Sequence, residues 1–281
     1  EQGMPVRLVQ TNSGNFYLGD LDEIRYFNRA LDLSQDTHLI DDERWETAKR
    51  CLKREFGHAQ SWEICRNIIL NFEQVYSRKY HSDWTNYLFE SKLEDFYPVQ
   101  GEAIVVSTIH KAKGKEFDNV FLLLTNIESL SDEKKREVYV AITRAKQNLS
   151  IHTNGHYLSN IANGLAEYRI NSNTYPAPQS LCYTLTHRDL WLDFFIDSHC
   201  QAAINTLKSG MSLRLTERGC TDFSNNEILR ISKKFKDILN ELIQKDYKLE
   251  KASVNFVVYW EKQEDKKEAK IVLPKVVFKK V

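Results

Sequence analysis

Between residues 31 and 95 the apolar residues recur every three or four positions, which is the spacing of one face of an α-helix. The tryptophans of this part follow the same spacing, so we interpret them as core residues rather than as groups that stack on nucleic-acid bases. The spacing predicts three helices, over 41–56, 60–78 and 82–94. The third helix is expected to turn Trp84, Leu88 and Phe89 toward this core.

Beyond residue 100 the pattern changes to continuous apolar runs of strand length. Residues 103–107 and 120–124 form two such runs, which are typical of strands buried on both faces in a parallel sheet. An amphipathic helix is predicted over 131–145, and a further strand over 149–152. A strand, a short crossover, a strand, a helix and a strand in this order predict an α/β unit.

A polar segment with two prolines, 171–180, is the best candidate for a domain boundary. Beyond it we expect a C-terminal α+β or barrel-like module over 181–281. Pro274 indicates an edge or a bulge in the last strand of that module. The pattern predicts helical structure from 186 to 210, a strand at 211–215, a helix near 226–246, and strands at 254–260 and 271–278.

The composition is that of a globular protein. Apolar residues make up 42% of the chain and charged residues 28%, which excludes collagen-like and mostly disordered classes. No run approaches the roughly 18 consecutive apolar residues of a membrane span, and no secretory signal opens the sequence, so we expect a cytoplasmic protein with no membrane partner. The five cysteines are odd in number and lack zinc-ligand spacing, which favours free thiols.

A polar stretch after the first buried strand carries the side chains best suited to chemistry. Thr108 and His110 come at the carboxyl end of a predicted parallel strand, where open α/β sheets bind ligands. Gly114 permits a close approach of the backbone to a ligand, and the carboxylate of Glu116 can accept hydrogen bonds from hydroxyl groups. Near the end of the following helix, the guanidinium of Arg144 could reach a phosphate that a neighbouring domain holds.

Two segments in this region read TIHKAKGKEF (108–117) and YVAITRA (139–145). Together they resemble motifs V and VI of superfamily 1 DNA helicases of the UvrD/Rep type. Residues 3–5 and 22–24 are similar to the segment that follows motif IV in these helicases. Lys115 departs from the pattern, because the family commonly has Leu at this position.

The resemblance implies an α/β fold with a RecA-like parallel sheet. Residues 1–153 would form the second RecA-like helicase domain, with a helical insertion at about 31–95. A linker over 154–180 would lead to the C-terminal accessory module at 181–281. The chain would then be the C-terminal part of an ATP-dependent DNA helicase.

The resemblance also implies roles for single residues. Arg144 would contact the γ-phosphate of ATP as the catalytic, phosphate-sensing arginine. Glu116 would approach the nucleotide sugar, with Gly114 shaping the loop between the nucleotide and the nucleic acid. The side chains of Thr108, His110 and Lys113 would bind single-stranded DNA.

Two motifs that ATP hydrolysis requires are missing from the sequence. The phosphate loop G-x-x-x-x-G-K-[ST] does not occur. Asp41 and Asp42 follow only two apolar residues, so they are interpreted as a helix cap rather than as a Walker B acid. We therefore expect ATP and Mg²⁺ to bind only in a complete protein with a first RecA-like domain upstream, and the chain alone to be inactive.

The 39 basic and 39 acidic residues balance over the whole chain, but the C-terminal end is basic. Lys233, Lys234 and Lys236 could form a phosphate-binding face for single-stranded or partly duplex DNA. A merely solvated helix face is an equal alternative. For the whole protein, the alternatives are a non-catalytic, helicase-derived protein that binds nucleic acid or a partner, and a fusion of this part to another helicase type such as RecQ.

Overall fold

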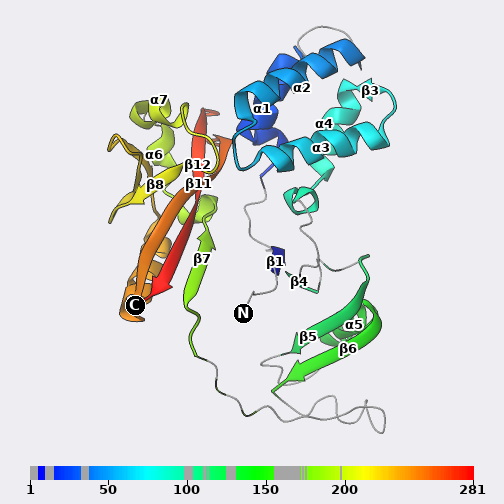
Figure 1. Ribbon diagram of the computed structural model, residues 1–281, viewed down its shortest axis with the longest axis vertical. Helices are drawn as coiled ribbons and strands as arrows, with labels where there is room; N and C mark the ends of the chain where they lie inside the picture. Colours follow the sequence, from blue (N-terminus) through cyan, green and yellow to red (C-terminus); the bar gives the residue numbers. More distant parts are fainter. Residues whose placement is uncertain are drawn as a thin grey trace. The chain divides into compact units, whose positions relative to one another are not determined.

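The computed structural model describes residues 6–9, 16–32, 38–97, 104–109, 112, 114–124, 131–154, 172, 174, 176–196 and 198–281. It has a mixed α/β fold with small parallel sheets and a C-terminal six-stranded antiparallel half-barrel, as expected for an α/β chain with a strand-rich end (Figure 1). The chain forms two compact units. Unit 1 comprises residues 1–11 and 100–176, and unit 2 comprises residues 12–99 and 177–281.

In its described residues, unit 1 contains two parallel strand pairs and one α-helix. Strand β1 (Val6–Val9) pairs with β4 (Ile104–Ser107), and β5 (Phe117–Leu124) pairs with β6 (Ala145–Thr153). Helix α5 (Asp132–Ile142) connects β5 to β6, which confirms the predicted α/β unit. The core of this unit consists of Leu122, Leu124, Val138 and Ala141, with Ile109 and Ile151 packed against it.

The predicted burial of these strands on both faces is wrong. In β5 the side chains of Leu122 and Leu124 are buried, but those of Phe121 and Leu123 are each 69% exposed. Successive strand residues point to opposite faces of a sheet. Since α5 packs on one face of the β5–β6 pair, only the alternate residues of β5 gain a buried environment.

The helical part of unit 2 has the helices that the sequence predicts. Their apolar faces meet in one core, and Trp84 and Leu88 are buried there. Phe89 is exposed instead, because it lies about 100° around the helix from Leu88. The elements are η1 (Leu18–Asp20), α1 (Asp22–Ala30), β2 (Leu39–Ile40), α2 (Asp42–Phe56), α3 (Trp62–Val75), β3 (Lys79–Tyr80), α4 (His81–Glu90) and η2 (Leu93–Phe96).

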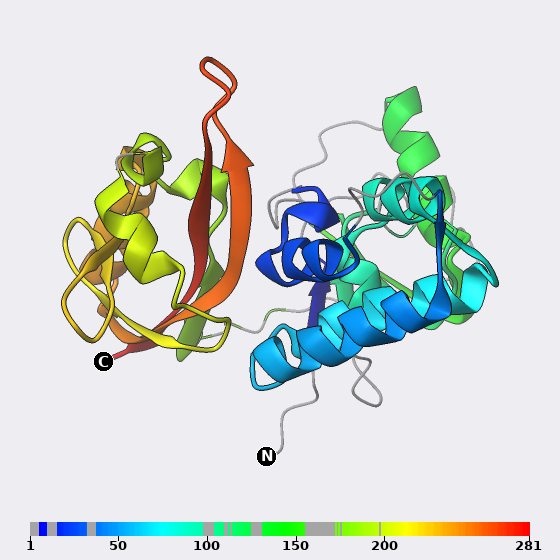
Figure 2. The same cartoon turned by 90° about the horizontal axis from the view of Figure 1, so that it is seen from above.

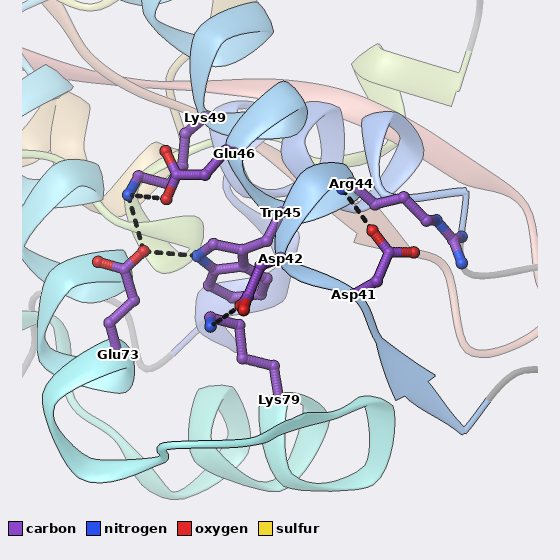
Figure 3. Close-up of polar contacts among 8 residues, drawn as sticks. All are labelled: Asp41, Asp42, Arg44, Trp45, Glu46, Lys49, Glu73 and Lys79. Carbon is purple, nitrogen blue, oxygen red and sulfur yellow. Dashed lines mark hydrogen bonds and ion pairs between the residues drawn. The ribbon is translucent and has the colours of Figure 1, made fainter.

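Trp45 lies at the centre of this core. Its ring has no exposed surface and packs edge-on against Phe27 and Trp84. Figure 3 shows its indole Nε1–H donating to Glu73 Oε1 at 2.7 Å, and Glu73 also accepts a hydrogen bond from Lys49 Nζ at 2.7 Å. The interpretation of the tryptophans at 45 and 84 as core residues, and not as base-stacking groups, is confirmed.

The six-stranded sheet has the order β10-β9-β8-β11-β12-β7. Figure 2 shows β11 and β12 as long strands running side by side to a charged hairpin. The bulge predicted at Pro274 is present, since the register shifts between Val254, its partner, and Phe256. The strands are β7 (Ser180–Thr184), β8 (Ser212–Leu215), β9 (Gly219–Thr221), β10 (Glu227–Arg230), β11 (Tyr247–Glu261) and β12 (Glu268–Lys280).

The helix predicted near 226–246 is shorter than expected. Residues 227–230 form strand β10, and helix α8 (Lys233–Gln244) begins after the N-cap Ser232. The apolar residues of 227–231 belong to the sheet. The sequence could not show this, because so short a buried run has no period that distinguishes a strand from a helix. The helical region predicted over 186–210 consists of the short helices η4 (His187–Asp189), α6 (Asp193–Ile196), η5 (Ser198–Cys200) and α7 (Gln201–Ile204).

In unit 2 the helices and the half-barrel share one hydrophobic core. A buried polar cluster joins them: the Ser61 hydroxyl donates to the Glu23 carboxylate, and the Ser209 hydroxyl donates to Ser61 Oγ at 2.7 Å. An ion pair of 2.8 Å between Lys270 and Asp22 lies in the same joint. This grouping differs from the domain division predicted at residues 153 and 181. That division rests on the family resemblance and stays a prediction.

Candidate nucleotide and nucleic-acid site

A main-chain hydrogen bond connects the end of α5 to the beginning of β5. Arg144 lies between α5 and β6, after the C-cap Thr143, and its carbonyl oxygen accepts a hydrogen bond from Phe117 N at 2.9 Å. Parallel pairing of β5 with β6 then continues from Phe117 opposite Ala145. The two sequence motifs therefore meet at one edge of the β5–β6 pair.

The guanidinium of Arg144 is held by three neutral oxygen atoms. Nε donates to the carbonyl of Val140 at 3.1 Å, Nη2 donates to Thr143 Oγ1 at 3.1 Å, and Nη1 donates to the carbonyl of Lys115 at 3.3 Å. The first two contacts fix the side chain on its own helix, and the third connects it to the loop before β5. Because none of these three acceptors carries a charge, they leave the positive charge of the guanidinium uncompensated.

Gly114 adopts a backbone conformation that favours glycine. Its φ is +81°, in the left-handed region. A Cβ built at this position would meet no described atom within 4 Å. The conformation of the loop, rather than close packing against the described residues, is therefore what requires glycine here.

Glu116 follows this loop and faces solvent. Its carboxylate lies 3.7 Å from Lys146 Nζ, and the two side chains are 59% and 53% exposed. An ion pair as exposed as this one contributes about 0–1 kcal/mol. The carboxylate can therefore exchange Lys146 for another hydrogen-bond donor at little cost.

Thr108 lies just after β4 and is exposed. Its carbonyl accepts a hydrogen bond from Ala112 N at 3.2 Å, while the next residue, Ile109, packs against the core of unit 1. His110 and Lys113 lie outside the described residues. The structure thus brings Gly114, Glu116 and Arg144 together, and it anchors the segment of Thr108 to the same core.

Asp41 and Asp42 are used for structure, as expected for a helix cap. Asp41 Oδ1 accepts a hydrogen bond from Arg44 N at 2.8 Å at the start of α2 (Figure 3). Asp42 pairs with Lys79 at 2.7 Å, and this hydrogen bond lowers the pKa of the Asp42 carboxyl. Across the ranges that the structure describes, no three His, Cys, Asp or Glu residues are grouped to bind a metal ion.

The three lysines of the predicted phosphate-binding face lie on the outside of α8. Lys233, Lys234 and Lys236 are exposed, whereas Phe235 and Leu242 of the same helix are buried. The amphipathic pattern of this helix is confirmed. Both interpretations of the lysines, as a phosphate-binding face and as a solvated face, fit this placement.

Sequence reasoning missed two features. The acceptor for Arg144 on the loop is the main-chain carbonyl of Lys115, and a main-chain contact leaves no trace in residue types. The sequence did mark Lys115 itself, because this residue departs from the family pattern. Trp191, whose side chain is exposed on the half-barrel, was also missed, since its neighbours Leu190 and Leu192 are apolar and a tryptophan in such a run is expected to be buried.

A comparison with protein families matches residues 65–156 to the UvrD-like helicase C-terminal domain. The matched range includes both segments that carry the resemblance, 108–117 and 139–145. Neither a curated protein nor a solved structure gives a significant match to the chain. In the described residues, no helix combines the length and apolar character needed to cross a membrane.

Proposed function

Taking residues 65–156 as a UvrD-like helicase C-terminal domain, we propose that the chain is the C-terminal part of an ATP-dependent DNA helicase. In this function Arg144 senses the γ-phosphate of ATP, and the loop at 108–116 forms part of the path of single-stranded DNA. The first RecA-like domain of the same protein would supply the phosphate loop. The division of the chain at about 153 and 181 belongs to this proposal.

One observation carries the proposal. The guanidinium of Arg144 donates to the carbonyl of Lys115, so the phosphate-sensing candidate contacts the loop that holds the other candidate residues. A phosphate that withdraws the guanidinium from this carbonyl would free the loop, because a charged acceptor forms a stronger hydrogen bond than a neutral one. This exchange would couple the nucleotide to the DNA-binding loop.

The side chains present fit one part of a bound nucleotide. Arg144 has a charge that its three neutral acceptors leave uncompensated, and Glu116 is accessible to the hydroxyl groups of a sugar. ATP would supply the phosphoanhydride bond whose hydrolysis drives the cycle. No described cluster of carboxylates fits Mg²⁺, so this ion belongs with the phosphate loop of the complete protein.

The DNA path is proposed for the loop that begins at Thr108. Substituting Ala for Thr108, His110 or Lys113 should weaken binding of single-stranded DNA, since each removes one polar contact to the DNA backbone. Lys92→Ala, an exposed lysine of the helical part, is the control for loss of one charge. If all three loop variants bind as the control does, the DNA path lies elsewhere.

A second contact with DNA is proposed for α8. Contacts from Lys233, Lys234 and Lys236 to phosphates would release condensed counterions, so the triple alanine variant should flatten the slope of log K against log[salt] by about 2–3 units. An unchanged slope for the triple variant of the whole chain would leave these lysines as a solvated face.

The ATPase activity of the chain alone tests the missing half of the nucleotide site. With single-stranded DNA present, the 281-residue chain should show no turnover above that of Arg144→Ala, because it lacks the phosphate loop. Turnover by the unaltered chain that Arg144→Ala abolishes would contradict the proposal. The rival function, a helicase-derived binding protein without catalysis, predicts that no phosphate loop occurs in the complete reading frame.

A further inference from the structure

Trp191 is an exposed aromatic residue on the half-barrel whose ring is contacted by a cation. Its side chain is 49% exposed. The guanidinium of Arg230 lies 5.4 Å from the centre of its ring and 5.0 Å from that of Phe194. Two hydrogen bonds of 2.8 Å to the carboxylate of Glu227 fix this guanidinium in turn. The indole is therefore supported from one side while about half of its surface stays accessible.

The backbone brings segments that carry basic residues next to the segment of this indole. Trp191 N donates to the carbonyl of Arg230 at 2.9 Å, and Ser232 N donates to the carbonyl of Asp189 at 2.8 Å. Ile231 N donates to the carbonyl of Arg218 at 2.9 Å. These bonds bring three separate segments of the chain side by side. The exposed cations on them are Arg188, Arg218, Lys233 and Lys234.

These four cations keep their charge available. Within the described part of the chain, none of them forms an ion pair. Two nearby acids have partners: Glu227 pairs with Arg230 and also attracts Arg218, and Asp189 accepts hydrogen bonds from the main chain and the hydroxyl of Thr186. Glu217, next to Arg218, and Asp237, one turn along α8 from Lys233, are exposed and offset part of the charge. The surface around Trp191 thus carries accessible cations beside one accessible aromatic face.

We infer that Trp191, Arg188, Arg218, Lys233 and Lys234 form a binding site for single-stranded nucleic acid, in which one base stacks on the indole and the cations bind the flanking phosphates. An aromatic face with surrounding cations is the combination that single strands use, because every base has a face to stack and every nucleotide a phosphate. The inference rests on the proposed function for DNA as the strand, and it adds a base contact that the lysines of α8 alone would lack.

A membrane surface or an acidic protein fits these observations less well. Membrane insertion requires several exposed apolar side chains together, whereas Phe194, the aromatic neighbour of Trp191, is partly buried under Arg230. An acidic peptide would satisfy the cations but would leave the indole without a planar partner. Both ligands are therefore tested as alternatives.

The test compares two ligands of equal length and equal phosphate count, an oligothymidylate and an abasic oligodeoxynucleotide. The 281-residue chain should bind the oligothymidylate about 5- to 140-fold more tightly, which is the range for stacking of one base. Trp191→Ala should remove this difference, and Trp191→Phe should keep part of it. Lys233→Ala/Lys234→Ala should weaken binding of both ligands and flatten the salt slope by about 1–2 units.

Phe223→Ala is the matched control. Phe223 is 63% exposed on the same half-barrel, and the guanidinium of Arg214 lies 5.1 Å from its ring, so it has the same kind of support as Trp191. Its loss should leave the preference for bases unchanged. Urea unfolding of each variant verifies that the half-barrel is folded.

Three results would overturn the inference: equal affinity of the unaltered chain for both oligonucleotides, a preference that survives Trp191→Ala, or binding to anionic vesicles or polyglutamate as tight as to the oligothymidylate. The loop of unit 1 is tested separately by Thr108→Ala and His110→Ala. Binding that depends on the loop and not on Trp191 refutes only this inference. The reverse result refutes only the DNA path of the proposed function.

Discussion

Replacing Glu23 by Gln should remove a pH-dependent loss of stability in unit 2. Glu23 is 2% exposed in the joint between α1, α3 and the half-barrel, and its Oε2 has no hydrogen-bond partner among the described residues. The pKa of its carboxyl is raised from 4.5 to about 7, chiefly by burial and to a smaller extent by Asp22, while hydrogen bonds from the Ser61 hydroxyl and the backbone and the charge of Lys270 oppose the shift. Cys65, whose thiol pKa burial also raises, lies near this carboxyl.

The sign of the effect follows from the two pKa values. Well below pH 4.5 the carboxyl is protonated in both the folded and the unfolded chain, so it costs nothing. As the pH rises to about 7, the unfolded chain ionises while the folded chain keeps its proton, and the free energy of unfolding falls. A difference of this size corresponds to about 3 kcal/mol at high pH, of which about 2–3 kcal/mol is lost between pH 5 and pH 8.

Urea unfolding followed by tryptophan fluorescence measures this loss in unit 2 alone, because all five tryptophans lie there. Relative to the unaltered chain, Glu23→Gln should gain about 2–3 kcal/mol between pH 5 and pH 8. A constant cost of an unpaired amide N–H, about 1–3 kcal/mol, shifts the Gln curve without changing this difference. Glu90→Gln, on the exposed surface of α4, is the control. Parallel profiles for Glu23→Gln and the unaltered chain would refute the reasoning.

Further predictions concern two other positions of unit 2. Glu73→Ala leaves the buried indole N–H of Trp45 without its acceptor and should lower the free energy of unfolding by about 1–3 kcal/mol, whereas Glu73→Gln, which keeps an acceptor, should cost less in the same urea titration. Gly219→Ala places a Cβ 1.8 Å from the carbonyl oxygen of Leu229 and should cost about 1–3 kcal/mol or more, measured by thermal unfolding; an unchanged midpoint would mean that β9 and β10 can separate without cost.

The helices of unit 2 were predictable because each depends on a local repeat of apolar residues. Trp45, Ala48, Leu52 and Phe56 recur at helical spacing, and all four are buried in α2. Strand β10 was not predictable, since four residues with two buried apolar side chains fit a strand and a helix turn equally well.

The site shows the same division between local and long-range information. The positions of Gly114, Glu116 and Arg144 follow from motifs, which are local. The contact of Arg144 with Lys115 joins residues 29 positions apart through a main-chain atom, and the partners of Glu23 include a hydroxyl network that reaches Ser209. Contacts between distant segments depend on the folded chain, so no local pattern reveals them.

The central claim is that Arg144 acts on the transferring phosphate of ATP. In the complete, ATPase-active protein, Arg144→Ala should lower kcat by about 10³- to 10⁵-fold and leave the affinity for single-stranded DNA nearly unchanged, because a cation aimed at the γ-phosphate acts on charge that develops during transfer. Arg136→Ala, an exposed arginine of the same helix α5, should leave kcat unchanged and serves as the matched control. A kcat of Arg144→Ala within about threefold of the unaltered protein, well short of the effect of an arginine finger, would contradict the account and make Arg144 a structural residue of the β5–β6 edge.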